Sequence, residues 1–373
     1  MRTLIRNARL VSPGWQREGS LLIEDGVILG EDNGTADEIF DAEGRIVMPG
    51  FIDIHSHGAD GADVCDARID SLWHIARRKL QEGVTTWLPT TLTQPVERLE
   101  EIVSRVAEIM TEPDLCRIPG IHLEGPFINP AKAGAQNPRF ARLPDLREIE
   151  TLHRIAPLKI ISLAPELPGA LDLITGACVS GIVCSAAHTA ATSDDVQKAK
   201  EAGLTHLTHF GNAMTPLHHR EIGVVGAGLY DDDLMIEVIC DGVHLSEGML
   251  KLVFKCVPIG RIMMITDSVA ASWRSDGVMK LGGLDAEIKG GVVRLGTGEL
   301  AGSTLRFNEG LRIVSETTGR PLSEIVAATS WNQARSLGLS GLGKLDPGFS
   351  ADLVMMDDDF SVHGVWVRGE RKV

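Results

Sequence analysis

Short apolar segments alternate with longer amphipathic ones between residues 50 and 266, and this alternation constrains the fold more than any other feature. Strand-length apolar runs separated by helix-length stretches are typical of parallel strands joined by helical crossovers. The predicted strands are Gly50–His55, Thr85–Pro89, Ile118–Leu123, Ile160–Ala164, Gly181–Ser185, Leu204–Phe210, Met235–Ile239 and Arg261–Thr266. The predicted helices include Val96–Met110, Leu146–Ile155, Asp194–Ala202 and Glu247–Lys255. This pattern favours an α/β fold, a (β/α)8 barrel, with a doubly wound open sheet as the alternative.

Both ends of the chain differ from this central region, because they are rich in strand-like runs and poor in helical ones. The first 45 residues contain three such runs, with a hairpin signal at Asp25 and Gly26, and residues 348–373 have the same character. We expect the two ends to pair into one small β-sandwich domain formed by residues 1–48 and 346–373. Residues 49–345 would then form the barrel.

Charge and cysteine content exclude several classes of protein. A formal net charge of −15, with no basic stripe to offset it, argues against a nucleic-acid partner. The apolar runs are too short to span a membrane, so no membrane partner is expected. The six cysteines are scattered without a C-x-x-C pair, which argues against a disulfide framework or a zinc knuckle and favours the cytoplasm.

Two histidines separated by one residue end the first predicted strand. His55 and His57 share one face of it, because side chains alternate along a strand. Two imidazoles directed at one point suit a divalent metal ion. Alone, the pair is equally compatible with two hydrogen-bonded core residues. The metal-binding interpretation depends on the polar residues that end the other predicted strands.

Four more candidate ligands or acids follow other strands, and these are Glu124, His188, His209 and Asp267. His122 and His206 lie two and three residues before members of this set, and we expect them to pack or to support the site. A carboxylate that closes an apolar run, as Asp267 does, is costly to bury unless it is paired or functional. Next to a metal-activated water, Asp267 would be the general base.

The segments that contain these residues, taken in chain order, resemble the N-acetylglucosamine-6-phosphate deacetylase family of the amidohydrolase superfamily. The resemblance runs nearly end to end. It rests on Pro49–Gly58, His122–Ala135, His188–Ala190, His209–Glu221, Asp241–His244, Thr266–Asp267, Leu300–Ser303 and Gly348–Val354.

The resemblance implies a divalent metal held by Glu124, His188 and His209. His55 and His57 would hold a second metal, which only some members keep, with Glu124 between the two. Zinc is the first expectation, and iron, manganese or cobalt would suit the same ligands. The resemblance further implies that an amino-sugar phosphate is the substrate. Its N-acetyl amide would be cleaved to the free amine and acetate, with Asp267 moving a proton from water to the leaving nitrogen.

Substrate contacts are also implied by the resemblance. They would come from Gln136, Asn212, Ala213, His244, Ala301, Gly302 and Ser303. Arg220 would reach the phosphate of a neighbouring subunit's substrate across a homodimer interface. Arginine suits that role because its planar guanidinium binds phosphate with two parallel hydrogen bonds.

Two departures from the family pattern leave alternatives open. Gln136 stands where members usually have a histidine that polarises the acyl carbonyl, and Phe210-Gly211 replaces a single bulky residue before Asn212. A different N-acyl sugar phosphate, such as N-acetylgalactosamine 6-phosphate, or a cyclic amide is therefore an alternative substrate. A third alternative is a sugar-phosphate binding protein without activity, against which the intact ligand set and Asp267 argue.

Overall fold

The computed structural model describes residues 1–30 and 35–373. Its central sheet has eight parallel strands that follow one another in chain order. They are β6 (Phe51–Ser56), β9 (Val84–Thr91), β10 (Ile121–Glu124), β11 (Leu158–Leu163), β12 (Val183–Ala186), β13 (His206–Leu207), β14 (Met235–Ile239) and β15 (Ile262–Ile265). All eight predicted strands are confirmed, although β13 is shorter than expected.

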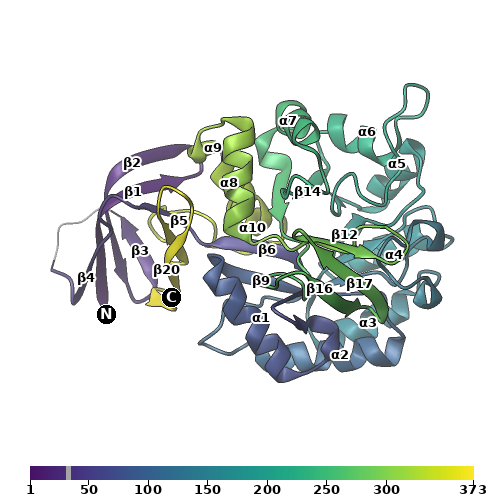
Figure 1. Cartoon of the computed structure of the whole chain (residues 1–373), viewed down its shortest axis with the longest axis horizontal. Coiled ribbons are helices and arrows are strands. Elements are labelled where there is room, and N and C mark those ends of the chain that lie inside the picture. Colours follow the sequence, from purple (N-terminus) through teal and green to yellow (C-terminus); the bar gives the residue numbers. More distant parts are fainter. Residues whose placement is uncertain (31–34) are drawn as a thin grey trace.

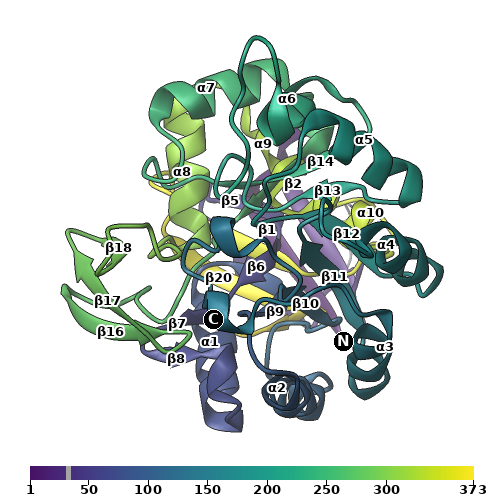
Figure 2. The same ribbon diagram turned by 90° about the vertical axis from the view of Figure 1, so that its right-hand side faces the viewer.

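One main helix follows each strand, and these helices surround the sheet (Figures 1 and 2). They are α1 (Ile69–Gln81), α2 (Val96–Ile109), α3 (Leu146–Ile155), α4 (Ala170–Val179), α5 (Ser193–Ala202), α6 (Gly223–Tyr230), α7 (Glu247–Cys256) and α8 (Phe307–Thr318). The sequence sets their ends locally: α5 begins with a capping box between Thr192 and Asp195 and stops at Gly203, which has a left-handed φ of 117°. No helix in the described part of the chain is long and apolar enough to cross a membrane.

Backbone hydrogen bonds join the first barrel strand to the segment after the last one. The amide of Asp267 donates to the carbonyl of His55 (2.9 Å), and the amide of His57 donates to the carbonyl of Ser268 (2.8 Å). These bonds nearly close the sheet into a (β/α)8 barrel. The doubly wound alternative is wrong, because the strand order of an open sheet reverses at a switch point and here it does not.

Strands from both ends of the chain form a second sheet, to the left in Figure 1. They are β1 (Arg2–Ser12), β2 (Trp15–Glu24), β3 (Val27–Gly30), β4 (Glu38–Asp41), β5 (Ile46–Pro49), β19 (Leu353–Met356), β20 (Val362–Val367) and β21 (Glu370–Arg371). The two ends meet where β5 pairs with β19, and Leu10, Leu21 and Trp366 are buried in its core. The extra β domain built from both termini is therefore confirmed. Its exact limits, 1–48 and 346–373, stay a prediction.

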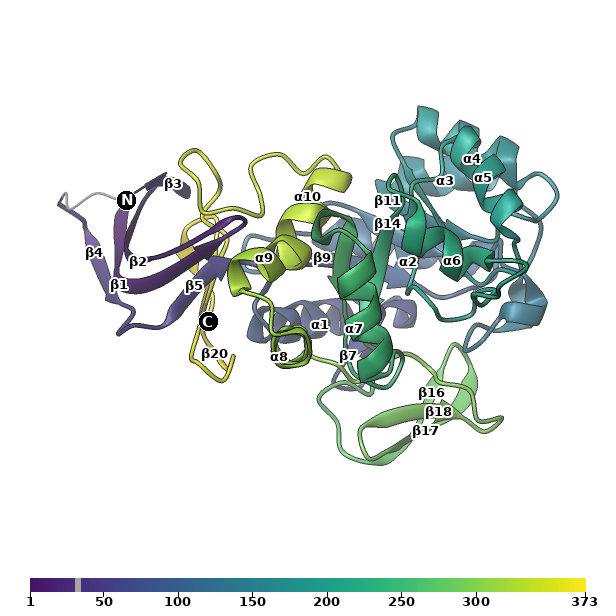
Figure 3. The same cartoon turned by 90° about the horizontal axis from the view of Figure 1, so that it is seen from above.

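A third, three-stranded sheet interrupts the chain between β15 and α8 and lies beside the barrel, apart from the terminal sheet (Figure 3). It consists of β16 (Gly277–Leu281), β17 (Leu284–Lys289) and β18 (Val292–Leu295). The hairpin turns are two Gly-Gly pairs, at 282–283 and 290–291, with positive φ at all four positions. These residues lie within 49–345, the range predicted for the barrel, and the sheet was not predicted from the sequence. Smaller elements are β7 (Gly58–Ala59), β8 (Ala62–Asp63), α9 (Leu322–Val326) and α10 (Asn332–Ser336).

Candidate active site

A cavity of about 420 Å³ opens at the carboxyl ends of the barrel strands, where this fold carries its active site. Five of the six predicted ligands and acids line it, and these are His57, Glu124, His188, His209 and Asp267. The sixth, His55, is fully buried, and its Nε2 lies 3.3 Å from Nε2 of His57. The barrel thus brings together side chains that are up to 212 positions apart in the sequence, from His55 to Asp267.

Backbone carbonyls hold two of the imidazole rings. Nδ1 of His57 lies 3.1 Å from the carbonyl of Thr90, and Nδ1 of His188 lies 2.9 Å from the carbonyl of Lys132. A carbonyl can only accept, so Nδ1 is the donor in both rings. In a neutral ring Nε2 then keeps its lone pair, which is the tautomer that binds a metal through Nε2.

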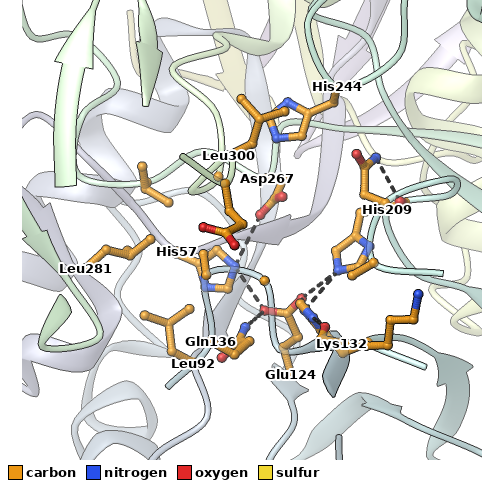
Figure 4. A pocket seen from close by; sticks show the side chains of 18 of the residues that line it. His57, Leu92, Glu124, Lys132, Gln136, His209, His244, Asp267, Leu281 and Leu300 are labelled. Carbon is orange, nitrogen blue, oxygen red and sulfur yellow. Dashed lines mark hydrogen bonds and ion pairs between the residues drawn. The ribbon is translucent and has the colours of Figure 1, made fainter. Parts of the chain in front are cut away.

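Glu124 lies between the rings of His57 and His209 (Figure 4). Its Oε1 is 3.2 Å from Nε2 of His188 and 3.1 Å from Nε2 of His209, whereas its Oε2 is 3.3 Å from Nε2 of His57. The side chain is almost fully buried at the end of β10. One carboxylate therefore contacts both halves of the cluster.

The electrostatics of the cluster favour positive charge at its centre. Burial raises the pKa of Glu124, but the charge on His55 and hydrogen bonds from His188 and His209 outweigh burial and hold the pKa well below its usual range. Burial also opposes ionisation of Asp267, yet His55 and His57 lower the pKa of Asp267 to about 2. For His57, burial favours the neutral ring, but the two carboxylates raise its pKa to about 9.

Strained backbone accompanies these side chains. His188, His209 and Asp267 have φ values of 45°, 33° and 48°, a region that residues other than glycine rarely occupy. Such conformations cost on the order of 1–3 kcal/mol each and cluster at functional sites, where the surrounding structure enforces them. At each of these positions, two residues after a barrel strand, the backbone leaves the extended conformation of that strand.

The donor set fits a divalent metal ion. Three groups have ligand atoms within 4.8 Å of one another: Glu124, His188 and His209 form the first, His55, His57 and Asp267 the second, and His55, His122 and Glu237 the third. Within them the Nε2 atoms of His188 and His209 are 3.2 Å apart, and those of His55 and His57 are 3.3 Å apart. Two nitrogen lone pairs at that distance would repel, so each pair of rings needs a proton or a metal ion between its Nε2 atoms. Imidazole and carboxylate donors suit several divalent metals.

The predicted substrate contacts divide into those that line the cavity and those that do not. Gln136, Asn212, Ala213, His244 and Gly302 line it. Ala301 and Ser303 are buried beside it, and the Ser303 hydroxyl donates to the carbonyl of Thr266 (2.5 Å). Arg220 is exposed, with a guanidinium nitrogen 2.7 Å from Nε2 of His219, and it does not line the cavity of its own chain.

His244 brings an imidazole ring held by a carboxylate into the cavity. Its Nδ1 lies 2.6 Å from Oδ2 of Asp241, whose Oδ1 accepts two backbone hydrogen bonds, from Val243 and His244. Burial opposes a charge on His244, but the adjacent carboxylate raises its pKa above the usual value. Lys132 also lines the cavity. The ammonium group of Lys132 and the imidazole of His244 are both hydrogen-bond donors that suit an anionic substrate.

Sequence reasoning missed three polar residues near the cluster. Lys132 and Glu299 line the cavity, and neither lies at the end of a predicted strand, where the other candidate residues were found. Glu237 lies within β14 and is fully buried, with Oε2 2.9 Å from Nδ1 of His55. A glutamate inside an otherwise apolar strand was the available signal, because a buried carboxylate needs a partner or a function.

Comparison with known proteins gives full-length similarities. A model of the amidohydrolase family matches residues 46–372. The N-acetylgalactosamine-6-phosphate deacetylase of Escherichia coli O157:H7 is 36% identical over 375 aligned positions, covering 99% of each chain. The N-acetylglucosamine-6-phosphate deacetylase of Bacillus subtilis is 38% identical over 324 positions, covering 85% of this chain and 82% of that protein.

Solved structures show the same similarity in three dimensions. A mutant N-acetyl-D-glucosamine-6-phosphate deacetylase from Mycobacterium smegmatis, solved in complex with N-acetyl-D-glucosamine-6-phosphate, aligns with a TM-score of 0.93 at 33% identity. The alignment covers 100% of this chain and 99% of that one.

Proposed function

The chain belongs to the amidohydrolase family, and we propose that it hydrolyses N-acetylglucosamine 6-phosphate to glucosamine 6-phosphate and acetate. The observation that carries this function is the buried cluster of histidines and carboxylates at the mouth of the barrel. It occurs in a chain that is similar along its length to deacetylases of this substrate, one of them solved with that sugar phosphate bound.

Glu124, His188 and His209 would hold one divalent metal, and His55 and His57 a second, with Glu124 between them. Zinc is the proposed ion, because it accepts imidazole and carboxylate ligands at a low coordination number. When bound, such a metal supplies Lewis acidity, which polarises the amide carbonyl and lowers the pKa of water to about 7.

Asp267 would move the proton. Its Oδ1 lies 3.2 Å from Nε2 of His57, so the carboxylate is aimed at the centre of the cluster. A pKa of about 2 keeps it ionised at neutral pH and ready to accept a proton from the attacking water. Donation of that proton to the amide nitrogen then lets the amine leave, because an amine anion is a poor leaving group.

The other contacts would orient the sugar phosphate. His244 would meet its anionic end, and Asn212 and Ala213 would contact the sugar or the phosphate. Gly302, with Ala301 and Ser303 beside it, would shape the pocket wall. The exposed Arg220 would complete the phosphate site of a second subunit in a homodimer. We further propose a cytoplasmic location, which rests on six free cysteines.

N-Acetylgalactosamine 6-phosphate is the second candidate substrate, because the E. coli relative carries that name and is similar over 99% of its length. It is not favoured, since the B. subtilis relative and the M. smegmatis structure are both named for the glucosamine epimer.

The decisive test is acetate release from both epimers, measured on purified protein whose metal content is quantified in the same sample. We expect turnover of the glucosamine epimer with a kcat/KM at least about tenfold above that of the galactosamine epimer. Metal-loaded protein that binds the sugar phosphate without releasing acetate would refute the proposed activity. A preference for the galactosamine epimer would reassign the substrate and leave the chemistry intact.

A further inference from the structure

Glu237 is a buried carboxylate that the proposed reaction does not use. It lies within β14, inside the barrel, and its side chain has no exposed surface. Its Oε2 lies 2.9 Å from Nδ1 of His55 and accepts a 3.3 Å hydrogen bond from the backbone amide of His209. Its Oε1 has no hydrogen-bond partner among the described residues.

Burying such a group is expensive unless it does something that an apolar residue could not. A carboxylate taken out of water loses its hydration, and one unpartnered oxygen leaves part of that loss uncompensated. No lysine or arginine within hydrogen-bonding distance pairs with Glu237 in the described part of the chain. Its positive partner must therefore come from the histidine cluster or from an ion bound there.

The contact with His55 sets the state of that ring. A carboxylate accepts, so Nδ1 of His55 carries the hydrogen and donates it to Glu237. Nε2 is then the free nitrogen, and it lies 3.3 Å from Nε2 of His57 and 3.5 Å from Oδ1 of Asp267. A carboxylate on the far nitrogen also makes an imidazole a more basic ligand. His57 lacks such a partner, because its Nδ1 donates to a neutral carbonyl.

We propose that Glu237 is a positioning residue that makes His55 a competent ligand, so that occupancy of the second metal position depends on Glu237. The inference rests on the proposed two-metal centre, with His55 and His57 at one position and His188 and His209 at the other. Glu237 reaches only the backbone of His209, so the position built from Glu124, His188 and His209 is affected much less.

The experiment measures metal content and affinity rather than turnover, so it does not depend on the deacetylase activity. Wild type, Glu237→Leu and Glu237→Gln are stripped of metal and titrated with Zn²⁺ by calorimetry, and bound zinc per chain is measured after gel filtration. Glu299→Gln is the matched control, because Glu299 lines the same cavity and no hydrogen bond or ion pair joins it to a histidine in the described part of the chain.

We expect about two zinc ions per wild-type chain and about one per Glu237→Leu chain, with the site of His55 and His57 lost. For Glu237→Gln, which keeps an oxygen acceptor, we expect weakening of that site by roughly 10–100-fold. The metal-free Glu237→Leu protein should lose some heat stability, because Nδ1–H of His55 and the backbone amide of His209 lose their buried acceptor, so the selective loss of one zinc site is the readout that decides. A residue that only supports the fold would lower the affinity of both zinc sites together.

Two zinc ions of unchanged affinity in Glu237→Leu would overturn the proposal, as would an equal loss at both sites. The proposal would also fail if the wild type and Glu237→Leu each bound one zinc ion per chain with the same affinity. If Glu237→Leu does not fold, unchanged affinity in Glu237→Gln overturns it instead. Failure of the deacetylase assay alone would refute the proposed function and leave this result standing.

Discussion

Nε2 of Gln136 donates a hydrogen bond to Oε2 of Glu124, the carboxylate at the centre of the histidine cluster. The same amide is fixed from its other end, because Oε1 of Gln136 accepts the backbone amide of Thr93 at 2.6 Å. This geometry makes Gln136 a support for Glu124 as well as a wall of the cavity. The role predicted for Gln136 in substrate binding stays a prediction.

Removing that hydrogen bond should weaken metal binding. In Gln136→Leu, Glu124 loses the donor that orients it, and we expect metal affinity to fall by about 10–100-fold, as for other partners of metal ligands. Equilibrium dialysis of zinc against a chelator measures the change. Gln197→Leu is the control, because it removes a glutamine-to-glutamate hydrogen bond on an exposed helix face. Equal affinity in all three proteins would contradict the supporting role.

Asp267→Asn should separate metal binding from turnover. The amide has the shape of the carboxylate but cannot accept the proton from water, so we expect kcat to fall by roughly 10²–10⁴-fold. Zinc at Glu124, His188 and His209 should remain. Asp276→Asn is the control, since Asp276 is exposed and only accepts a backbone hydrogen bond from Gly290. Near-normal turnover in the Asp267 variant would show that another group moves the proton.

A buried ion cluster behind the barrel strands predicts a large stability effect. Nζ of Lys79 lies 3.1 Å from carboxylate oxygens of both Asp53 and Glu82, and all three side chains are fully buried. Lys79→Met leaves two buried carboxylates without their cation, so we expect a loss of about 3–5 kcal/mol in the free energy of unfolding.

Urea unfolding of metal-loaded protein measures this loss. Lys251→Met breaks an exposed pair with Glu247 on α7, and should cost no more than about 0.5 kcal/mol. Similar losses in both variants would mean that water reaches the Lys79 cluster.

The burial of His206 predicts how the free energy of unfolding changes with pH. Burial lowers its pKa to about 3 in the folded chain, whereas an unfolded chain has about 6.5. Between these values only the unfolded state binds the proton, so this contribution to stability declines as the pH falls below about 6.5. His206→Gln has no such titration. Relative to wild type, the variant should therefore gain about 1 kcal/mol between pH 7 and pH 5.5.

Urea unfolding of both proteins at the two pH values tests this expectation. Every other titrating group is common to both, so the change in their stability difference isolates His206. A constant difference would mean that the folded ring also takes up a proton in this range.

The barrel was predictable because its signals are local. Each strand is a short apolar run, and the residue that ends it, such as Glu124 or Asp267, can be read without knowing where the other strands lie. The three-stranded sheet was missed, although the Gly-Gly turns at 282–283 and 290–291 are equally local signals. The family resemblance predicts that Arg220 binds the phosphate of a neighbouring subunit's substrate. In the structure of a single chain the Arg220 side chain is exposed.

By itself, the sequence determined the order of strands and helices and the set of residues that end each barrel strand. It did so because periodicity and chain breaks depend on neighbours in the chain. Only the tertiary structure decided which side chains meet. Nδ1 of His55 contacts Glu237, 182 residues away, because barrel closure places β6 and β14 around one interior. Charge and solvent exclusion in that interior, rather than any local pattern, determine what those residues can bind.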